Sequence, residues 1–302
     1  MTRALLLLCA FALAAHAQEA EPQAPKGPAV GAAAPVFEGT DDQGKPWRSS
    51  EHVGEGKVLV VYFYPADMTG GCTAQACAYR DAAASLKAEG ITVVGVSGDT
   101  VENHQVFKKA HSLSFTLLAD PEGKLAQAFG VPTGPGGKFK AKLEGGEATL
   151  ERGVTARRWT FVIGPDGKLL HRDERASPTL DALHVRLVAA RALKKLQEGT
   201  PPELSKRLAE TIDLLQRGET KAFLERCIPP QKLATVLARG KRTVEQLAEQ
   251  MKPRAAQGAA QLAGCKDKAA EVLPSGDAAV FELGPGRQVW FEKVDGVWYL
   301  GD

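Results

Sequence analysis

The sequence predicts two folded domains: an α/β domain over residues 29–199, followed by a small α+β domain over residues 200–302. In the first half, apolar β-branched runs alternate with stretches of helical spacing, which is typical of an α/β sheet fold. After Pro201-Pro202 the composition shifts to helical stretches and then to short strand-like runs separated by turns, which indicates helices followed by an antiparallel meander. The chain of 302 residues, 44% of them apolar, is long enough to give each domain its own core.

The residues before the first domain have the pattern of an export signal. Arg3 precedes the apolar run Ala4–Ala15, which is too short to span a bilayer comfortably, and Ala15-His16-Ala17 has the small-x-small form of a cleavage site. We therefore expect a signal peptide over residues 1–17, cleaved after Ala17, and a secreted or periplasmic protein with no stable membrane insertion. An uncleaved membrane anchor is the alternative. Residues 18–28 are polar and rich in Pro and Ala, which predicts a flexible leader.

The net charge bears on nucleic-acid binding, and the number of cysteines bears on disulfide formation. Cleavage would remove Arg3 and leave 37 basic against 36 acidic residues, a net charge of about +1 that gives no support for binding nucleic acid. Four cysteines would remain, and an even number in an oxidising compartment suggests pairing. Cys227 and Cys265 are the candidates for a structural disulfide of the second domain, and two free buried thiols are the alternative.

The elements of the first domain follow from apolar runs and the residues that interrupt them. β-Branched and aromatic runs predict strands at Lys57–Tyr64, Ile91–Ser97, Phe115–Leu118, Trp159–Ile163 and Leu169–His171. Helical spacing predicts helices at Cys72–Glu89, Val101–His111, Leu125–Phe129 and Leu180–Gln197. Alternating apolar residues around Gly145-Gly146 predict a surface hairpin within Pro132–Gly153. This order of elements matches a thioredoxin-like fold.

The second domain is predicted from the same signals. Helices are expected at Glu203–Arg217, Thr220–Cys227, Gln231–Ala238 and Thr243–Met251. Strands are expected at Ala270–Leu273, Ala278–Leu283, Gln288–Val294 and Val297–Leu300. This half contains no Ser-His-Asp set, no Gly-rich phosphate loop and no close metal-ligand cluster, so its function stays open. Five histidines are isolated in the sequence, and we expect them to face solvent or the edge of the core and assign none as a ligand: His52, His104, His111, His171 and His184.

The segment Val60–Asp81, VVYFYPADMTGGCTAQACAYRD, carries the strongest chemical signal. A buried strand ends near Pro65, and the turn residues Gly70-Gly71 bring Cys72 to the start of a predicted helix. A thiol at that place meets unpaired backbone N–H groups and the positive end of the helix dipole, and both favour the nucleophilic thiolate. The segment therefore predicts a redox site at Cys72, with Cys77 as a second cysteine five residues later.

The pattern Pro65-x-x-x-Thr69-x-x-Cys72 resembles the active-site segment of peroxiredoxins, the thiol-dependent peroxidases. The Cys-x4-Cys spacing resembles the bacterioferritin comigratory protein branch of that family, also called peroxiredoxin Q. Val30–Trp47, Ile91–Thr100 and Arg158–Leu169 resemble the family's N-terminal hairpin, its next core strand and the strand that carries its active-site arginine. The resemblance covers residues 30–196 and does not reach the second domain.

The resemblance implies a role for each residue of the motif. Cys72 would be the peroxidatic nucleophile, Thr69 would form hydrogen bonds beside the thiolate and the peroxide, and Pro65 would shield and rigidify the loop. Arg158, rather than the adjacent Arg157, would supply a fixed positive charge. The sequence departs from the family at Gly70 and Gln75, where proline and glutamate are common.

Cys77 is expected to be the resolving cysteine, which forms a disulfide with oxidised Cys72. In a regular helix, the Cα atoms of residues i and i+5 lie roughly 8–9 Å apart, whereas a disulfide allows about 7 Å at most. The first turns of the helix must therefore unwind before the two sulfurs can bond. An ordinary buried helix thiol is the alternative for Cys77.

These interpretations lead to an exported peroxidase that reduces hydrogen peroxide or organic hydroperoxides and is itself reduced by a thioredoxin-like partner. The resemblance implies no metal, haem or flavin. One alternative is a thioredoxin-like disulfide oxidoreductase, whose usual spacing is Cys-x-x-Cys. Another is a non-enzymatic copper-delivery protein on the same fold, and a third places the main function in a C-terminal binding module. The hairpin within Pro132–Gly153 is either a loop without function or a lid or docking surface for the reducing partner.

Overall fold

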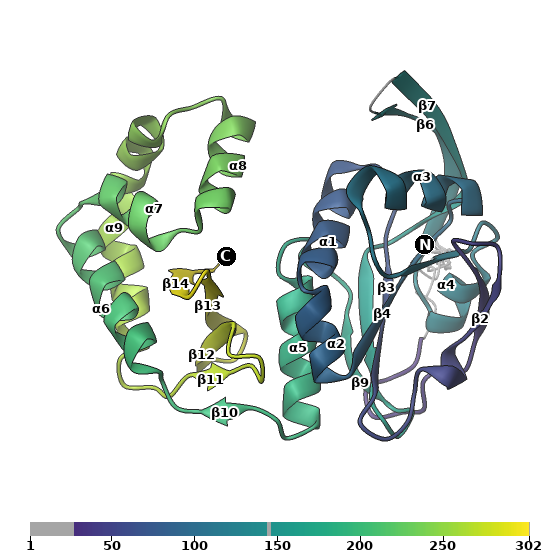
Figure 1. Cartoon of the computed structure of the whole chain (residues 1–302), viewed down its shortest axis with the longest axis horizontal. Coiled ribbons are helices and arrows are strands. Elements are labelled where there is room, and N and C mark those ends of the chain that lie inside the picture. Colours follow the sequence, from purple (N-terminus) through teal and green to yellow (C-terminus); the bar gives the residue numbers. More distant parts are fainter. Residues whose placement is uncertain (1–26, 144–145, 302) are drawn as a thin grey trace, which may run out of the picture.

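The computed structural model describes residues 27–143 and 146–301, which form two domains (Figure 1). The first contains a seven-stranded mixed sheet with helices on both faces, and the second packs helices against a five-stranded antiparallel sheet. The predicted signal peptide and most of the predicted leader lie outside the described residues. None of the described helices is both long and apolar enough to cross a membrane.

The sheet of the first domain has the strand order β2-β1-β5-β4-β3-β8-β9. Its strands are β1 (Glu38–Asp41), β2 (Pro46–Arg48), β3 (Val58–Phe63), β4 (Ile91–Ser97), β5 (Thr116–Ala119), β8 (Trp159–Ile163) and β9 (Leu169–Asp173). β3 runs parallel to β4 and antiparallel to β8. Every residue of β3 is buried, because helices cover both faces of the sheet. This arrangement confirms the predicted thioredoxin-like α/β fold.

The helices of this domain are a short 3-10 turn η1 (Ser49–Glu51), α1 (Gly70–Asp81), α2 (Ala83–Glu89), α3 (Val101–His111), α4 (Lys124–Phe129) and α5 (Asp181–Ala192). One face of the sheet packs against residues of α1, α2, α3 and α5, and the other packs against α4. The prediction of one helix over 72–89 was wrong in detail, because Ala82 interrupts it at φ −85° and ψ 0°. The helix predicted to reach Gln197 ends at Ala192, and Lys194 turns the chain with a left-handed φ of 53°.

A two-stranded hairpin, β6 (Thr133–Leu143) and β7 (Gly146–Ala156), extends beyond the body of the first domain (Figure 1). It confirms the hairpin predicted within Pro132–Gly153 and is longer than expected at its base. Gly153 makes that base possible, since a Cβ there would lie 2.0 Å from the Pro121 carbonyl oxygen.

The second domain contains α6 (Pro202–Gln216), α7 (Thr220–Cys227), α8 (Pro230–Gly240) and α9 (Val244–Ala263). Its sheet contains β10 (Gln197–Glu198), β11 (Glu271–Val272), β12 (Ala278–Gly284), β13 (Arg287–Val294) and β14 (Val297–Leu300), paired in that order. Helices followed by an antiparallel meander confirm the predicted α+β class. The chain enters this sheet at Gln197, before the predicted boundary at residue 200. α9 runs twelve residues beyond the predicted end at Met251, through Pro253, because Ala255, Ala259 and Leu262 of its far half are buried in the core.

Helix α5 joins the two domains. Ala182, Val185 and Ala189 pack in a core cluster of the first domain, whereas Leu187 and Ala190 pack with residues of the second sheet. The domains therefore share one helix with two apolar faces.

The expected disulfide between Cys227 and Cys265 is not formed, since the four described cysteines are all free thiols. Both residues are buried in the same core but in different surroundings. Cys227 ends α7, and its thiol interacts with Thr211 and Arg207 of α6. Cys265 follows α9, and burial alone raises its thiol pKa to about 11. Two separately buried, protonated thiols are the alternative that the sequence had left open.

Candidate active site

Cys72 is the third residue of α1, close to the helix start, as the sequence predicts. Thr69 is the extended N-cap residue, and Gly70-Gly71 form the first helical positions. The Cys72 side chain packs in the core cluster against β3, and the residue is only 2% exposed. A buried sulfur at a helix start is held in a fixed place, beside backbone N–H groups that favour negative charge.

Arg158 is the residue that contacts this sulfur. Its Nη2 lies 3.3 Å from Cys72 Sγ. Arg158 comes just before β8, and the first residue of β8, Trp159, pairs with Phe63 at the end of β3, where the chain turns toward Cys72. The glycine at position 71 gives the guanidinium room, because a Cβ there would lie 3.2 Å from Arg158 Nη2. A fixed positive charge therefore lies beside the predicted nucleophile.

The neighbouring Arg157 takes no part in this contact. It is exposed, and its backbone N–H donates to the Pro132 carbonyl at 2.9 Å. The choice of Arg158 over Arg157 from the sequence agrees with this geometry.

Buried hydrogen bonds also hold Arg158 through the guanidinium nitrogen that does not contact Cys72. Its Nη1 donates to Gln75 Oε1, and Gln75 Nε2 donates to Asp181 Oδ2 at 2.6 Å. The hydroxyls of Tyr79 and Thr160 donate to the same Asp181 oxygen at 2.6 and 2.8 Å. Burial raises the pKa of Asp181, and these three donors oppose that rise by favouring the carboxylate. The geometry fixes Gln75 as acceptor from the guanidinium and donor to the carboxylate.

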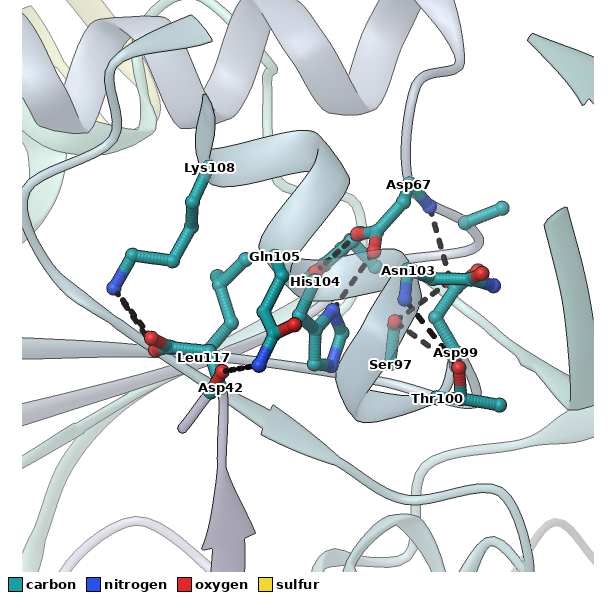
Figure 2. Close-up of polar contacts among 12 residues, drawn as sticks. Asp42, Asp67, Ser97, Asp99, Thr100, Asn103, His104, Gln105, Lys108 and Leu117 are labelled. Carbon is teal, nitrogen blue, oxygen red and sulfur yellow. Dashed lines mark hydrogen bonds and ion pairs between the residues drawn. The ribbon is translucent and has the colours of Figure 1, made fainter. Parts of the chain in front are cut away.

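The loop between Pro65 and Thr69 is anchored by a second buried network, which Figure 2 shows in part. Asp67, 1% exposed, accepts from the Tyr64 hydroxyl at 2.7 Å, and its other carboxylate oxygen lies 2.8 Å from Nδ1 of the fully buried His104. The Asp67 backbone N–H donates to Asp99 Oδ2 at 3.0 Å. Asp67 thus ties the loop to α3 and to the end of β4.

Asp99 connects this network to the hairpin. It accepts from the Ser97 hydroxyl at 2.8 Å and from Asn103 Nδ2 at 3.0 Å, and the same Asn103 amide donates to the Glu151 carbonyl of β7 at 2.8 Å. The residue after Asp67, Met68, adopts a left-handed φ of 61°, which is a strained conformation for a residue other than glycine. The network holds Asp67 before this turn, and the Thr69 hydroxyl after it donates to the Ala66 carbonyl.

The charges of this network are coupled. Burial alone would lower the pKa of His104, but the neighbouring Asp67 and Asp99 carboxylates outweigh burial and raise it. The pKa of Asp99 is raised by its burial and by the nearby Asp67 charge. The raised pKa of His104 shifts its titration toward the imidazolium form beside the Asp67 carboxylate. The expectation that the histidines face solvent or the core edge was wrong for His104.

Pro65 and Thr69, the other residues of the motif, are both half-buried. The Thr69 hydroxyl donates to the Ala66 carbonyl at 3.0 Å, a bond that closes the loop. The proposed role of Thr69 beside the thiolate and the peroxide stays a prediction.

Cys77 lies on the same helix as Cys72 and is half-buried. Burial raises the pKa of its thiol, and the Arg80 charge partly opposes that rise. Because α1 is continuous from Gly70 to Asp81, the two sulfurs belong to one intact helix, the state in which the helix geometry prevents a disulfide.

The sequence did not predict the buried residues that hold Arg158 and the loop before Cys72. Asp67 lies inside the motif, but its partner His104 is 37 residues away, and Gln75 and Asp181 are separated by 106 residues. No local pattern marks such pairs. Across 27–143 and 146–301, no group of three or more His, Cys, Asp or Glu side chains could hold a metal ion.

The first domain is similar in sequence to known proteins. Residues 30–172 match the family model described as the AhpC/TSA family. Peroxiredoxin Bcp of Bacillus subtilis is 40% identical over 141 residues, which cover 47% of this chain and 82% of the relative. The chloroplastic peroxiredoxin Q of Sedum lineare is 48% identical over 103 residues, 34% of this chain and 54% of the relative, so the chain spans about half of that plant protein.

Among solved structures, a crystal structure of peroxidoxin BcpB from Mycobacterium tuberculosis is 31% identical, with a TM-score of 0.45 over 54% of this chain and 97% of that chain. The matched family model ends at residue 172 and thus lies within the first domain. With 40% identity across four fifths of the Bacillus protein, this chain belongs to the peroxiredoxin family, among relatives of the Q and Bcp type.

Proposed function

We propose that this chain is an exported thiol-dependent peroxidase that reduces hydrogen peroxide or organic hydroperoxides. The observation that carries the proposal is the Arg158 guanidinium 3.3 Å from the Cys72 sulfur, at the start of a helix. A fixed cation beside a buried thiol stabilises the thiolate and polarises an approaching peroxide. Family membership supports the same reaction class.

The first step is attack of the Cys72 thiolate on one peroxide oxygen. The O–O bond breaks, the second oxygen takes up a proton and leaves as water or an alcohol, and Cys72 becomes a sulfenic acid. Arg158 neutralises charge on the sulfur and on the departing oxygen. The relay through Gln75 and Asp181 keeps the guanidinium in place during this step.

The second step is condensation of the Cys77 thiol with the sulfenic acid, which forms the Cys72–Cys77 disulfide and releases water. A thioredoxin-like dithiol then returns both cysteines to thiols. Export is supported by the composition of residues 1–17, and N-terminal sequencing of the mature protein tests it: a chain that begins at Gln18 is expected.

Peroxide consumption by the purified chain tests the proposal. Cys72→Ser is expected to abolish turnover, because a serine hydroxyl is a far weaker nucleophile at neutral pH. Cys77→Ser is the matched control, since it should still consume one equivalent of peroxide through Cys72. Consumption by Cys72→Ser near the wild-type rate would exclude Cys72 as the reacting group.

A further inference from the structure

A groove of about 630 Å³ lies between the two domains, and Cys77 is one of its lining residues. The first domain contributes the exposed side of α1 and the start of α5. The second domain contributes the start of α8, the residue just before it and the turn between β13 and β14. The C-terminal domain therefore forms one wall of the space onto which the predicted resolving cysteine opens.

A buried ion network fixes this wall in place. Arg186 of α5, 2% exposed, contacts Glu89 of α2 at 2.7 Å and Asp277 of the second domain at 2.6 Å. Ser85 of α2 donates to the other Asp277 oxygen at 2.8 Å. The Arg186 and Glu89 side chains are buried and the Asp277 side chain is 35% exposed, so these charge-assisted bonds link α2 and α5 to the second domain.

The start of α1 and the following helix α2 differ in how many side-chain bonds hold them. At the start of α1, the Thr69 side chain makes no capping bond, two glycines form the first positions and no acidic residue lies in the first turn. On α2, which follows α1, Ser85 donates to Asp277 of the second domain and Glu89 is paired with Arg186 of α5. We therefore expect Cys72 to move toward Cys77 on oxidation, which leaves Cys77 on the groove.

We propose that this groove is the docking site for the cysteine-bearing segment of a protein dithiol, and that the C-terminal domain recognises this reductant. The proposal rests on the peroxidase function and names the surface that its reductant uses. Pockets of roughly 300–1,000 Å³ hold ligands of drug size, so the groove can take a segment of several residues rather than one side chain. Exposed charges of both signs, Asp81, Lys293 and Asp295, line it and can recognise such a segment.

The reduction is a thiol–disulfide exchange that enters from the groove. A thiolate of the partner attacks the Cys77 sulfur, the Cys72–Cys77 bond breaks, and Cys72 leaves as a thiolate that returns to Arg158 as the helix reforms. The partner's second thiolate then attacks the partner sulfur of the mixed disulfide and releases Cys77, which takes up a proton. The partner is oxidised to a disulfide, and two electrons reach the peroxidase.

To test this proposal, a larger side chain is placed in the groove of the full-length chain. Gln231 is exposed on α8 and lines the groove, whereas Ala238 is exposed on the same helix and does not. With thioredoxin as the probe reductant, Gln231→Arg is expected to raise the KM for thioredoxin about tenfold, the scale of losing one favourable contact region. Gln231→Ala, which leaves the groove open, and Ala238→Arg should both behave like the wild type.

Two further measurements separate this inference from the peroxidase function. Peroxide-driven formation of the Cys72–Cys77 disulfide should proceed at the wild-type rate in Gln231→Arg, and its reduction by dithiothreitol should also be unchanged. If the wild type forms no disulfide with peroxide, the proposed function itself fails. If the disulfide forms but Gln231→Arg leaves the KM for thioredoxin unchanged, or slows dithiothreitol equally, the groove is not a protein docking site.

Discussion

The Arg158 guanidinium contacts the Cys72 sulfur through Nη2 at 3.3 Å and donates to Gln75 through Nη1, so one side chain joins the thiol to a buried amide. Gln75 completes that connection by donating to Asp181 at 2.6 Å. A neutral amide between the arginine and the carboxylate leaves the full positive charge of Arg158 next to the sulfur. Where glutamate, common at this position in the family, would place a negative charge beside Arg158, Gln75 of this chain places none.

Replacing Arg158 should affect the peroxide step directly. Arg158→Met is expected to slow oxidation of Cys72 by on the order of a hundredfold, the scale for removing one preorganised donor. The rate of sulfenic acid formation in a single turnover measures this step. Arg157→Met is the control and should have little effect, because Arg157 is exposed. If Arg157→Met proved the more damaging change, Arg158 could not be the active-site arginine.

Removing Gln75 should weaken the reaction through Arg158. Gln75→Leu keeps the volume but deletes both hydrogen bonds, so the guanidinium loses its support and the peroxide step should slow by roughly tenfold. Tyr79→Phe is the matched control: it deletes another bond to the same Asp181 oxygen without touching Arg158. Tyr79→Phe should cost about 1 kcal/mol of unfolding free energy with an unchanged rate. Equal slowing by both variants would show that the carboxylate, and not Gln75, supports the site.

The His104–Asp67 pair should make stability depend on pH. The folded-state pKa of His104 is raised above 6.5, so its stabilising contribution is complete below pH 6.5 and is lost as the pH rises through the folded-state value. Urea unfolding should therefore show a free energy that falls above pH 6.5. His104→Gln, whose amide can still donate to Asp67, should remove that fall.

His184 provides a control with the opposite sign. Burial lowers the folded-state pKa of His184 below 6.5, so its contribution is lost as the pH falls below 6.5. His184→Gln should change the slope only on the acidic side. If His104→Gln left the slope above pH 6.5 unchanged, the imidazolium–carboxylate pair would not form in solution.

Local patterns predicted the elements whose boundaries are set by nearby residues. β4 and α3 match their predicted ranges, because Thr100 accepts from the Asn103 N–H and starts the helix where the apolar strand has ended. The sequence pattern predicts that α9 ends at Met251, yet the helix continues through Pro253 to Ala263 because its far half is buried in the core. Cys72 and Arg158 were predicted from sequence motifs. Asp181 and His104 were not, because their partners lie far along the chain.

Oxidation of the wild type should produce a Cys72–Cys77 disulfide and local unwinding at the start of α1. Amide exchange should become faster from Gly70 to Cys77, because that end of the helix lacks a side-chain cap. Exchange in α2 should stay slow, because its carboxylate Glu89 remains bound to Arg186. Peptide mapping combined with hydrogen exchange after one equivalent of peroxide measures both effects.

Cys77→Ser should leave the first oxidation intact, since Arg158 and Cys72 are unchanged. The sulfenic acid then has no neighbouring thiol on α1 and should persist, and excess peroxide should convert it to sulfinic acid. Mass spectrometry of the Cys72 peptide distinguishes these states, and wild-type protein treated in the same way should accumulate much less sulfinic acid. Mapping that joined Cys72 to Cys227, to Cys265 or to a second chain would exclude Cys77 as the resolving residue. It would also remove the reason for a reductant to enter the groove between the domains, while the peroxide reaction at Cys72 would still stand.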